Sequence, residues 1–189
     1  KKLLARFKYH LAKQPFSPSD FTASLEKGEK ALSGYLAWYK YNWPNRIVNE
    51  FSVRGVFLGE IKLNGKIDKL ELSETGETRV VDYKTGKPKT RNHIMGLTKS
   101  AGSGDYLRQV VFYKLLLENL DQKYRVTSGL IDFIEPDDKN RYKQEEFALS
   151  ASDVAGLSEQ IRQVHSEILS LEFLSKGCGE KDCEWCHLW

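Results

Sequence analysis

The chain has 189 residues, which is enough for one domain with a hydrophobic core. Its composition, 40% apolar and 29% charged, is typical of a globular protein in water, and a net charge of +3 does not by itself indicate a nucleic-acid partner. The sequence contains no run of eighteen apolar residues and no signal-peptide pattern at its start. We therefore expect no membrane span and a cytoplasmic location.

Helices and strands alternate along the sequence in a pattern that predicts one α/β domain. Apolar residues at helical spacing predict helices over residues 3–13, 20–43, 105–120 and about 151–172. Strands are predicted over residues 46–63, 66–72, 78–84, 124–134 and 142–149. Pro15 and Pro44 end the first two helices. Asn64-Gly65 predicts a tight hairpin turn, because both central positions of such a turn need a positive φ.

Charged residues interrupt two predicted strands in "GKIDKLELSETGETRVVDYKTGKPK", residues 65–89. Asp82 and Lys84 project from the same face of their strand, and one antiparallel register places Asp68 beside them. Two carboxylates that close repel each other, and Mg²⁺ or Mn²⁺ would relieve the repulsion. A lysine at such a site can position a water molecule or neutralise developing charge, which indicates phosphodiester hydrolysis. The alternative is a surface hairpin with cross-strand Asp–Lys pairs, each contributing roughly a few tenths of a kcal/mol.

The segment after Lys84 carries charge of one sign. Residues 83–104 include no acidic residue, and a loop of cations beside a carboxylate site predicts a track for phosphates. The predicted nucleic-acid contacts are Lys87, Lys89, Arg91, Lys99 and Arg108. The following helix places Gln109 and Tyr113 one turn apart on one face, an unusual polar pair within an apolar helix.

Three motifs in order, "GKIDKLE", "VVDYKTGK" and "RQVVFYKLLL", resemble the RecB-like branch of the PD-(D/E)xK nuclease superfamily. The resemblance implies a restriction-endonuclease-like α/β core, in which helices flank a central mixed β-sheet. It implies Asp68 and Asp82 as ligands of Mg²⁺ or Mn²⁺, with the backbone carbonyl of Tyr83 as a further ligand. Lys84 would position the attacking water and stabilise the transition state.

The resemblance also concerns residues outside the strand pair. It implies that Gln109 and Tyr113 organise the site and the DNA, and that Glu50 occupies a position where these nucleases often carry another acidic contributor to the metal site. The family has an upstream helix with a metal-site histidine in a Gly-x-x-x-His setting, which this sequence lacks. We expect that helix to lie before Lys1, in a chain truncated at its N-terminus, with His10 as the alternative ligand.

Three cysteines lie close together near the end of the sequence, in "CGEKDCEWCHLW". Cys178, Cys183 and Cys186 have spacings that suit Zn²⁺ or a [4Fe–4S] cluster, and both normally take a fourth ligand. His187 directly follows Cys186 and is poorly placed to bind the same ion. The resemblance to AddB-type and CRISPR-associated RecB-like nucleases implies a fourth cysteine before Lys1. The alternative is three reduced cysteines in a frayed tail.

Five aromatic residues, Tyr35, Trp38, Tyr39, Tyr41 and Trp43, gather towards the end of the second predicted helix. Such side chains can stack the bases of single-stranded DNA. Their helical spacing favours packing in the core or against another domain instead.

We expect one nuclease domain over residues 1–189, with a helical lead-in at 1–45, a catalytic core at 46–150, a C-terminal helix at 151–177 and a cysteine tail at 178–189. The predicted function is a metal-dependent DNA nuclease, an exonuclease acting on single-stranded DNA or DNA ends in repair and recombination. No Gly-x-x-x-x-Gly-Lys-Ser/Thr loop is present, so a UvrD/Rep-type or AddAB-like helicase motor is expected elsewhere in the polypeptide or in a partner subunit. The alternatives are a non-catalytic DNA-binding or scaffold module and an RNA-directed nuclease.

Overall fold

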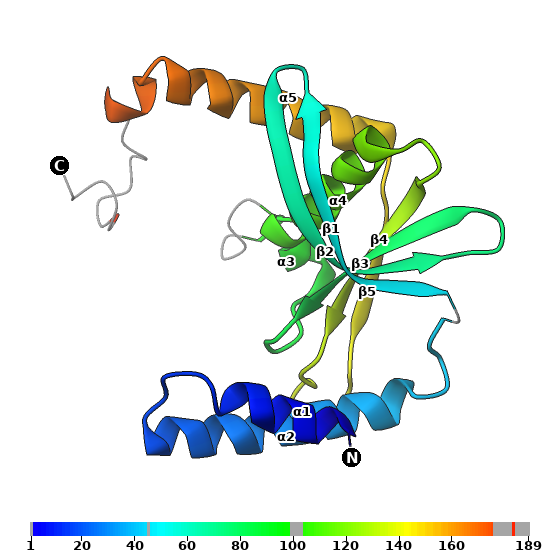
Figure 1. Ribbon diagram of the computed structural model, residues 1–189, viewed down its shortest axis with the longest axis vertical. Helices are drawn as coiled ribbons and strands as arrows, with labels where there is room; N and C mark the ends of the chain where they lie inside the picture. The colour runs from blue at the N-terminus through cyan, green and yellow to red at the C-terminus, as the bar shows by residue number, and fades with distance from the viewer. Residues whose placement is uncertain (1, 45, 99–103, 176–182, 184–189) are drawn as a thin grey trace.

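The computed structural model describes residues 2–44, 46–98, 104–175 and 183. Its helices are α1 (Lys2–Leu11), α2 (Pro18–Tyr39), α3 (Arg91–Ile94), α4 (Asp105–Leu120), α5 (Ala151–Leu169) and the 3₁₀ helix η1 (Glu172–Ser175). Its strands are β1 (Ile47–Leu58), β2 (Ile61–Leu72), β3 (Glu77–Lys84), β4 (Arg125–Phe133) and β5 (Gln144–Ala148). Figure 1 shows how the helices surround the sheet.

The sheet has five strands in the order β1-β2-β3-β4-β5. β3 and β4 are parallel, and every other neighbouring pair is antiparallel, so the sheet is mixed, as predicted. Because parallel neighbours end at the same edge, Lys84 and Phe133 close β3 and β4 side by side. In Figure 1 the α1–α2 hairpin lies across this end of the sheet, where β4 leaves and β5 enters.

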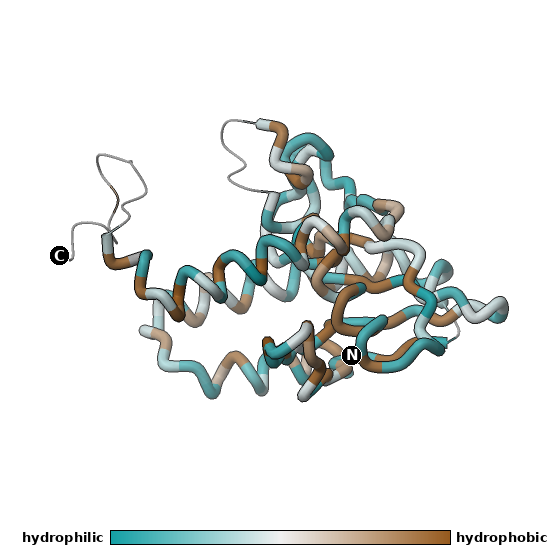
Figure 2. Tube along the Cα trace, turned by 90° about the horizontal axis from the view of Figure 1, so that it is seen from above, coloured by the Kyte–Doolittle hydropathy of each residue, from teal (hydrophilic) through white to brown (hydrophobic). Residues whose placement is uncertain are grey.

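The core lies between the sheet and α4. α4 begins at Asp105, as predicted, and buries an apolar surface that includes Val110, Leu115 and Leu116. Sheet residues complete this core, including Val53, Ile67, Leu70, Val80, Ile131 and Phe133. α5 packs on α4, and in Figure 2 hydrophobic and hydrophilic residues alternate along it, as expected for a helix with one covered side.

The hairpin turn predicted at Asn64-Gly65 is wrong. β1 and β2 are joined at Gly59-Glu60, and Gly59 has a φ of 64°, the sign that the first central residue of a type II′ turn needs. Gly65 lies inside β2 and pairs with Val53, and a Cβ there would come 2.3 Å from Cδ1 of Leu116. The glycine therefore lets α4 approach β2 rather than forming a turn.

Asn64 also has a role inside the strand pair rather than in a turn. Its Oδ1 accepts a hydrogen bond of 2.9 Å from the backbone N–H of Gly55. Gly55 has a φ of 68° and lies where the β1–β2 register shifts, so this side chain satisfies a donor in a β-bulge.

The remaining boundaries differ little from the prediction. The predicted loop 85–104 contains the short helix α3, whose N-cap Thr90 accepts a hydrogen bond from the N–H of His93. Ser17 caps α2 by accepting from the N–H of Asp20. Within the described part of the chain, we find no helix with the length and apolar character that crossing a membrane requires.

Candidate active site

β3 ends in the two charged residues that interrupt its apolar pattern. Asp82 is 1% exposed, and Lys84 keeps 18% of its side chain exposed. Nζ of Lys84 lies 2.7 Å from Oδ2 of Asp82. Both side chains reach the face of the sheet that α4 covers, whereas Tyr83 between them faces the other way, its ring 6.4 Å from that of Tyr35 in α2. Because side chains alternate between the two faces of a strand, Asp82 and Lys84 both lie on the face that α4 covers. Asp82 is buried there, whereas Lys84, the last residue of β3, is partly exposed.

α4 supplies two more polar side chains and closes a ring of contacts. Lys84 Nζ donates to Oε1 of Gln109 over 2.6 Å, and Nε2 of Gln109 donates to the hydroxyl of Tyr113 over 3.0 Å. The Tyr113 hydroxyl donates in turn to Oδ1 of Asp82 over 2.9 Å. The ring of Tyr106 lies beneath the ammonium, 4.5 Å from Nζ of Lys84. Four side chains, two from β3 and two from α4, therefore hold one another in place; we call them the polar ring.

Asp68 brings a second carboxylate to the same place from the neighbouring strand. β2 pairs Lys69 with Val81, and continuing this register by one residue sets Asp68 level with Asp82. Oδ2 of Asp68 accepts a hydrogen bond of 2.9 Å from the backbone N–H of Tyr83. The sequence predicted this pairing, and the structure brings Asp68, Asp82, Lys84, Gln109 and Tyr113 together.

Burial dominates the electrostatics of Asp82. Removal from water raises the pKa of its carboxyl, and the charge of Asp68 raises it further, while Lys84 and the hydroxyl of Tyr113 act in the opposite direction. The pKa of the Tyr113 phenol is also raised, by burial first and then by the charge of Asp82, so this hydroxyl remains a proton donor at neutral pH. The site therefore concentrates negative charge that its own residues compensate only in part.

The donor set fits a hard divalent cation. Oδ2 of Asp82 is buried and accepts no hydrogen bond from the described residues, although Lys84 lies close to it. The carboxylates of Asp82 and Asp68, with the backbone carbonyl of Tyr83, offer oxygen ligands of the kind that Mg²⁺ and Mn²⁺ prefer. No group of three or more His, Cys, Asp or Glu side chains comes together among the described residues, so two carboxylates are what the described chain offers here.

Neither predicted additional metal ligand lies within the polar ring. Glu50 has a φ of 57° and sits between the register pairs Asn49–Lys69 and Phe51–Ile67, which brings its backbone near Asp68. Its side chain is exposed and forms an ion pair with Lys66. His10 is an exposed residue of α1 whose ring packs edge-on against Tyr9.

The three cysteines are described only in part. Cys183 is half-buried, whereas Cys178 and Cys186 lie outside the described residues. The Zn²⁺ or [4Fe–4S] site predicted from their spacing therefore stays a prediction.

The basic segment after Lys84 is compensated by acidic residues that follow β4. Lys87 pairs with Asp138 over 2.6 Å, and Arg91 pairs with Glu145 over 3.1 Å while its guanidinium lies 4.0 Å from the ring centroid of Phe147. Lys89 contributes its carbonyl, which accepts from Lys143, and Arg108 pairs with Asp105. Lys99 lies outside the described residues. The contacts of Arg91 dock α3 on β5, a role that a local view of residues 83–104 does not reveal.

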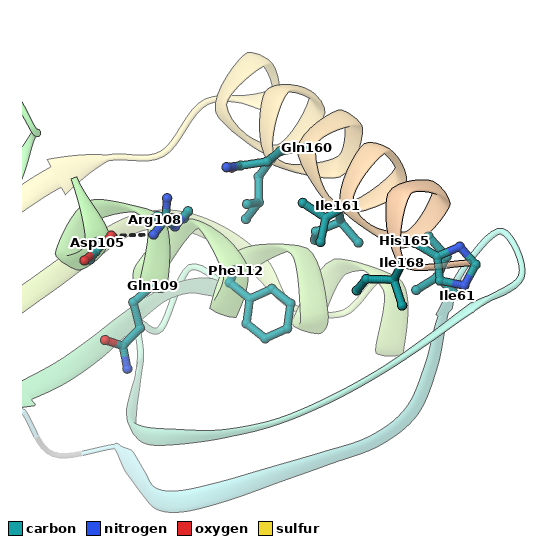
Figure 3. A pocket seen from close by; sticks show the side chains of 11 residues that line it. Ile61, Asp105, Arg108, Gln109, Phe112, Gln160, Ile161, His165 and Ile168 are labelled. Atoms are coloured by element: carbon teal, nitrogen blue, oxygen red, sulfur yellow. Dashed lines mark hydrogen bonds and ion pairs between the residues drawn. The ribbon is translucent and has the colours of Figure 1, made fainter. Parts of the chain in front are cut away.

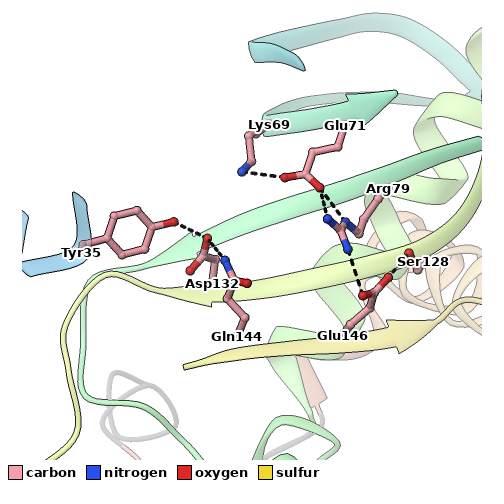
Figure 4. Close-up of polar contacts among 8 residues, drawn as sticks. All are labelled: Tyr35, Lys69, Glu71, Arg79, Ser128, Asp132, Gln144 and Glu146. Atoms are coloured by element: carbon pink, nitrogen blue, oxygen red, sulfur yellow. Dashed lines mark hydrogen bonds and ion pairs between the residues drawn. The ribbon is translucent and has the colours of Figure 1, made fainter. Parts of the chain in front are cut away.

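A second buried carboxylate, which the sequence analysis missed, lies on the opposite face of the sheet. Asp132 is fully buried next to Tyr83 in the β3–β4 register. Its Oδ2 accepts hydrogen bonds of 2.5 Å from the hydroxyl of Tyr35 and 2.9 Å from Nε2 of Gln144 (Figure 4). Burial raises the pKa of Asp132, and the same burial, with Asp132 beside it, raises that of Tyr35. The signal was present: an aspartate within the apolar stretch "GLIDFI" resembles the one in "VVDYK".

A chain of ion pairs follows on this face along β2, β3 and β5 (Figure 4). Lys69 pairs with Glu71 over 2.8 Å, Glu71 with Arg79, and Arg79 with Glu146 over 3.0 Å. Oε1 of Glu146 accepts from the hydroxyl of Ser128. Each of these charges has a partner of opposite sign among the described residues, so the network ties β2, β3 and β5 together.

An apolar groove of about 500 Å³ opens beside the polar ring, between α4, α5 and the β1–β2 hairpin. Figure 3 shows Phe112, Ile161 and Ile168 along it, with Arg108 and Gln109 at one end. His165 lines the same groove.

A family model of the PD-(D/E)XK nuclease superfamily matches residues 2–189 of the chain. Among solved structures, one reported as "Crystal structure of SSO0001" matches with a TM-score of 0.46 and 16% sequence identity, over 89% of this chain and 70% of that chain. A search of curated proteins finds no match to this sequence.

Proposed function

The chain belongs to the PD-(D/E)XK nuclease superfamily, and we propose that it is a metal-dependent nuclease that hydrolyses phosphodiester bonds of DNA. Within the superfamily we assign it to the RecB-like branch, because Asp68, the Asp82–Lys84 pair and the Gln109–Tyr113 pair follow one another in that branch's order. The substrate we propose is single-stranded DNA or a DNA end, in the context of repair or recombination. A helicase motor would supply such ends, in the same polypeptide or in a partner subunit.

The observation that carries the proposal is the polar ring together with Asp68. Two carboxylates on neighbouring strands repel each other, and burial raises the pKa of Asp82, so the arrangement costs free energy in the folded protein. Side chains chosen only for stability would avoid this cost, since an apolar pair at the same positions carries no such penalty. A site that binds a cation and a phosphate explains why the charges are there.

Each residue of the polar ring has a distinct role in this proposal. Asp68, Asp82 and the carbonyl of Tyr83 would hold Mg²⁺ or Mn²⁺, which would polarise the phosphate and lower the pKa of an attacking water. Lys84, partly exposed at the end of β3, would hold that water and stabilise the negative charge that develops on the phosphate oxygens.

The two residues of α4 act through the others. Gln109 accepts from the ammonium of Lys84 and so restricts where its positive charge lies. Tyr113 donates to Oδ1 of Asp82, so Oδ2, which faces the ammonium of Lys84, is the oxygen that accepts no hydrogen bond from the described residues. Both are positioning residues, and we expect their loss to lower activity less than loss of Lys84.

Cleavage of end-labelled single-stranded DNA tests the proposal, with Mg²⁺, Mn²⁺ or EDTA present. We expect metal-dependent cutting that Asp82→Ala abolishes and that Lys84→Ala slows at least about 100-fold, the effect of removing one preorganised charge donor. Lys123→Ala is the matched control, because Lys123 is exposed and pairs only within its own turn, with Asp121 over 2.9 Å. Cutting that persists in Asp82→Ala would refute the assignment. DNA binding without cutting by the unaltered chain would favour the scaffold alternative.

A further inference from the structure

A pocket of about 380 Å³ lies between α2 and the loop that joins β4 to β5, outside the polar ring. Trp38 forms one wall and Tyr142 another, with their ring centroids 6.0 Å apart. Pro136, Asn140 and Lys30 complete the lining. A half-open pocket with two aromatic walls, an amide and an ammonium suits a flat ligand with polar edges and a negative charge attached.

The Tyr142 wall is fixed before any ligand arrives. Its hydroxyl donates to the carbonyl of Ala31 over 3.1 Å, and its ring packs on that of Tyr35 at a centroid distance of 5.9 Å. Gly34 in α2 makes this approach possible, because a Cβ there would come 2.1 Å from the Tyr142 hydroxyl. Trp38, in contrast, is 52% exposed, so one aromatic face remains for a partner.

The loop opposite α2 is also held in shape. The carboxylate of Asp137 pairs with the guanidinium of Arg141 over 2.7 Å and accepts from the backbone N–H of Lys139 and Arg141 over 2.8 and 2.9 Å. Asn140 at its tip has a φ of 57°, which asparagine tolerates better than most residues. The side-chain amide of Asn140 lines the pocket and makes no hydrogen bond to the described residues, so it is available to a ligand.

The charges around the pocket favour an anion. The three carboxylates of the loop are each neutralised by a cation, in the pairs Lys27–Glu135, Arg141–Asp137 and Lys87–Asp138. Lys30 lines the pocket and forms no ion pair within the described residues. α1 lies along α2 and adds the exposed cations Lys2, Arg6 and Lys8, with no acidic residue before Asp20. Glu26 and Glu29, in the turn of α2 before Lys30, add negative charge, so Lys30 and the cations of α1 are the groups that a phosphate would contact.

A row of packed rings joins the pocket to β3, on the face of the sheet opposite the polar ring. From Trp38 the row passes to Tyr142, then to Tyr35 at 5.9 Å and to Tyr83 at 6.4 Å, and Tyr83 lies between Asp82 and Lys84 in β3. Base–aromatic stacking is the usual way in which proteins hold single strands without reading their sequence.

From this geometry we infer that the Trp38–Tyr142 pocket holds one unpaired base of a single-stranded DNA. The base stacks on Trp38, its edge meets the amide of Asn140, and its phosphate meets Lys30. The inference rests on the proposed nuclease function for its substrate class, but it concerns binding and can be measured without cleavage. Bases within a duplex are stacked on one another, so the pocket selects single strands.

The test is binding of a fluorescein-labelled oligothymidylate, followed by anisotropy in EDTA so that no strand is cut. We expect Trp38→Ala to weaken binding roughly 5- to 150-fold, the equivalent of one stacked base, and Trp38→Phe to restore most of it. Trp43→Ala is the matched control, because Trp43 is also 52% exposed and does not line the pocket. Circular dichroism of each variant shows whether it folds. Equal binding by the Trp38→Ala and Trp43→Ala variants would overturn the inference.

Three further arms separate the base from the backbone and from the nuclease function. An oligonucleotide of abasic sites should bind the unaltered chain and Trp38→Ala equally, and Lys30→Gln should reduce the slope of log affinity against log salt by about 0.7, the value for one phosphate contact on a single strand. If Trp38→Ala weakens the binding of oligouridylate but not that of oligothymidylate, the assignment of the pocket to DNA is overturned. A chain that binds through Trp38 but never cuts would refute the proposed function and leave the pocket assignment standing; a chain that binds no oligothymidylate would refute the pocket.

Discussion

Replacing Tyr113 by phenylalanine tests whether the polar ring stabilises a charged Asp82. The change keeps the buried ring, which is 4% exposed, and removes only the hydroxyl that donates to Oδ1 of Asp82 and accepts from Gln109. Oδ2 of Asp82 keeps its ion pair with Lys84, so the variant removes the one hydrogen bond to this carboxylate that the described residues supply, at Oδ1. Hydrogen bonds to charged groups contribute about 1.5–3 kcal/mol, so we expect Tyr113→Phe to lower the free energy of unfolding by about that much at pH 8.

The loss should depend on pH, because the pKa of Asp82 is raised by burial. A carboxyl whose folded-state pKa lies above its ordinary value of 3.8 contributes stability that is present below pH 3.8 and lost as the pH rises through the folded-state pKa. The Tyr113 hydroxyl lowers the pKa of Asp82 and so limits that loss. Near pH 3.5 the carboxyl is mostly neutral in both states, and the missing hydrogen bond should cost closer to the 0.5–1.5 kcal/mol, roughly, of a bond between neutral groups.

Urea unfolding at pH 8 and pH 3.5 measures both values, and at pH 8 the melting temperature should fall by about 3–12 °C for a chain of this length. Tyr124→Phe is the matched control: the ring of Tyr124 packs on Phe51 at 5.8 Å, and its hydroxyl makes no hydrogen bond to the described residues. The control should change stability by less than about 0.5 kcal/mol at either pH. Equal losses for Tyr113→Phe at the two pH values would refute the argument, since the hydroxyl would then not be stabilising a charge.

Two further predictions concern packing and the loop beside the Trp38–Tyr142 pocket. Gly65→Ala places a methyl group 2.3 Å from Cδ1 of Leu116 and should cost about 1–3 kcal/mol in thermal or urea unfolding, whereas Gly156→Ala, with open space around it in α5, should stabilise by up to about 1 kcal/mol. Equal effects of the two changes would contradict the close approach of α4 to β2. Arg141 holds the pKa of Asp137 at about 2, so this carboxylate contributes stability above pH 3.8 that is lost as the pH falls through about 2. An NMR titration of the carboxyl carbon should show this pKa returning towards 3.8 in Arg141→Gln; an ordinary value in the unaltered chain would argue against a preorganised loop.

The arrangement of the candidate site could be predicted because it follows from short-range geometry. The period of two in a strand places Asp82 and Lys84 on one face, and the spacing of four in a helix places Gln109 and Tyr113 on one face. Only the position of Asp68 depends on a neighbouring strand. The connection between β2 and β3 has four residues, so the two strands pair as antiparallel neighbours within a narrow range of registers. Rules that apply within one element, or between two sequential strands, therefore suffice for this part.

The turn between β1 and β2 could not be predicted from local chemistry. Asn64-Gly65 is a strong turn signal. A glycine is needed at position 65, however, because Leu116 packs against it, and Leu116 lies in α4, about fifty positions further along the chain. The side chain of Asn64 accepts a hydrogen bond from the backbone N–H of Gly55, at a bulge in the neighbouring strand. In both cases a long-range contact sets the residue type, and the same two residues in isolation favour a different structure.

Long-range pairing also changes the interpretation of the basic loop. Residues 83–104 hold cations without acids, yet Lys87 and Arg91 meet Asp138 and Glu145, which follow in the chain after α4 and β4. Local charge patterning cannot show this compensation, because the parallel crossover from β3 to β4 is what brings the two segments together. Lys30, far from the loop in sequence, lies beside the Trp38–Tyr142 pocket and forms no ion pair with the described residues.

Asp82 of β3 and Asp132 of β4 are buried carboxylates on opposite faces of the sheet, and their partners differ. Burial raises the pKa of both Asp82 and Asp132, and each keeps one oxygen that accepts no hydrogen bond from the described residues. Asp82 has an ammonium 2.7 Å away and a second carboxylate on the next strand, which suits a charge that Lys84 and a bound cation would balance together. Asp132 is fully buried and accepts hydrogen bonds from the hydroxyl of Tyr35 and the amide of Gln144. These contacts attach α2 to the sheet. Since Tyr35 also packs on Tyr83 and Tyr142, the helix that carries Trp38 is held against the strand that carries the proposed catalytic residues, on the face opposite the polar ring.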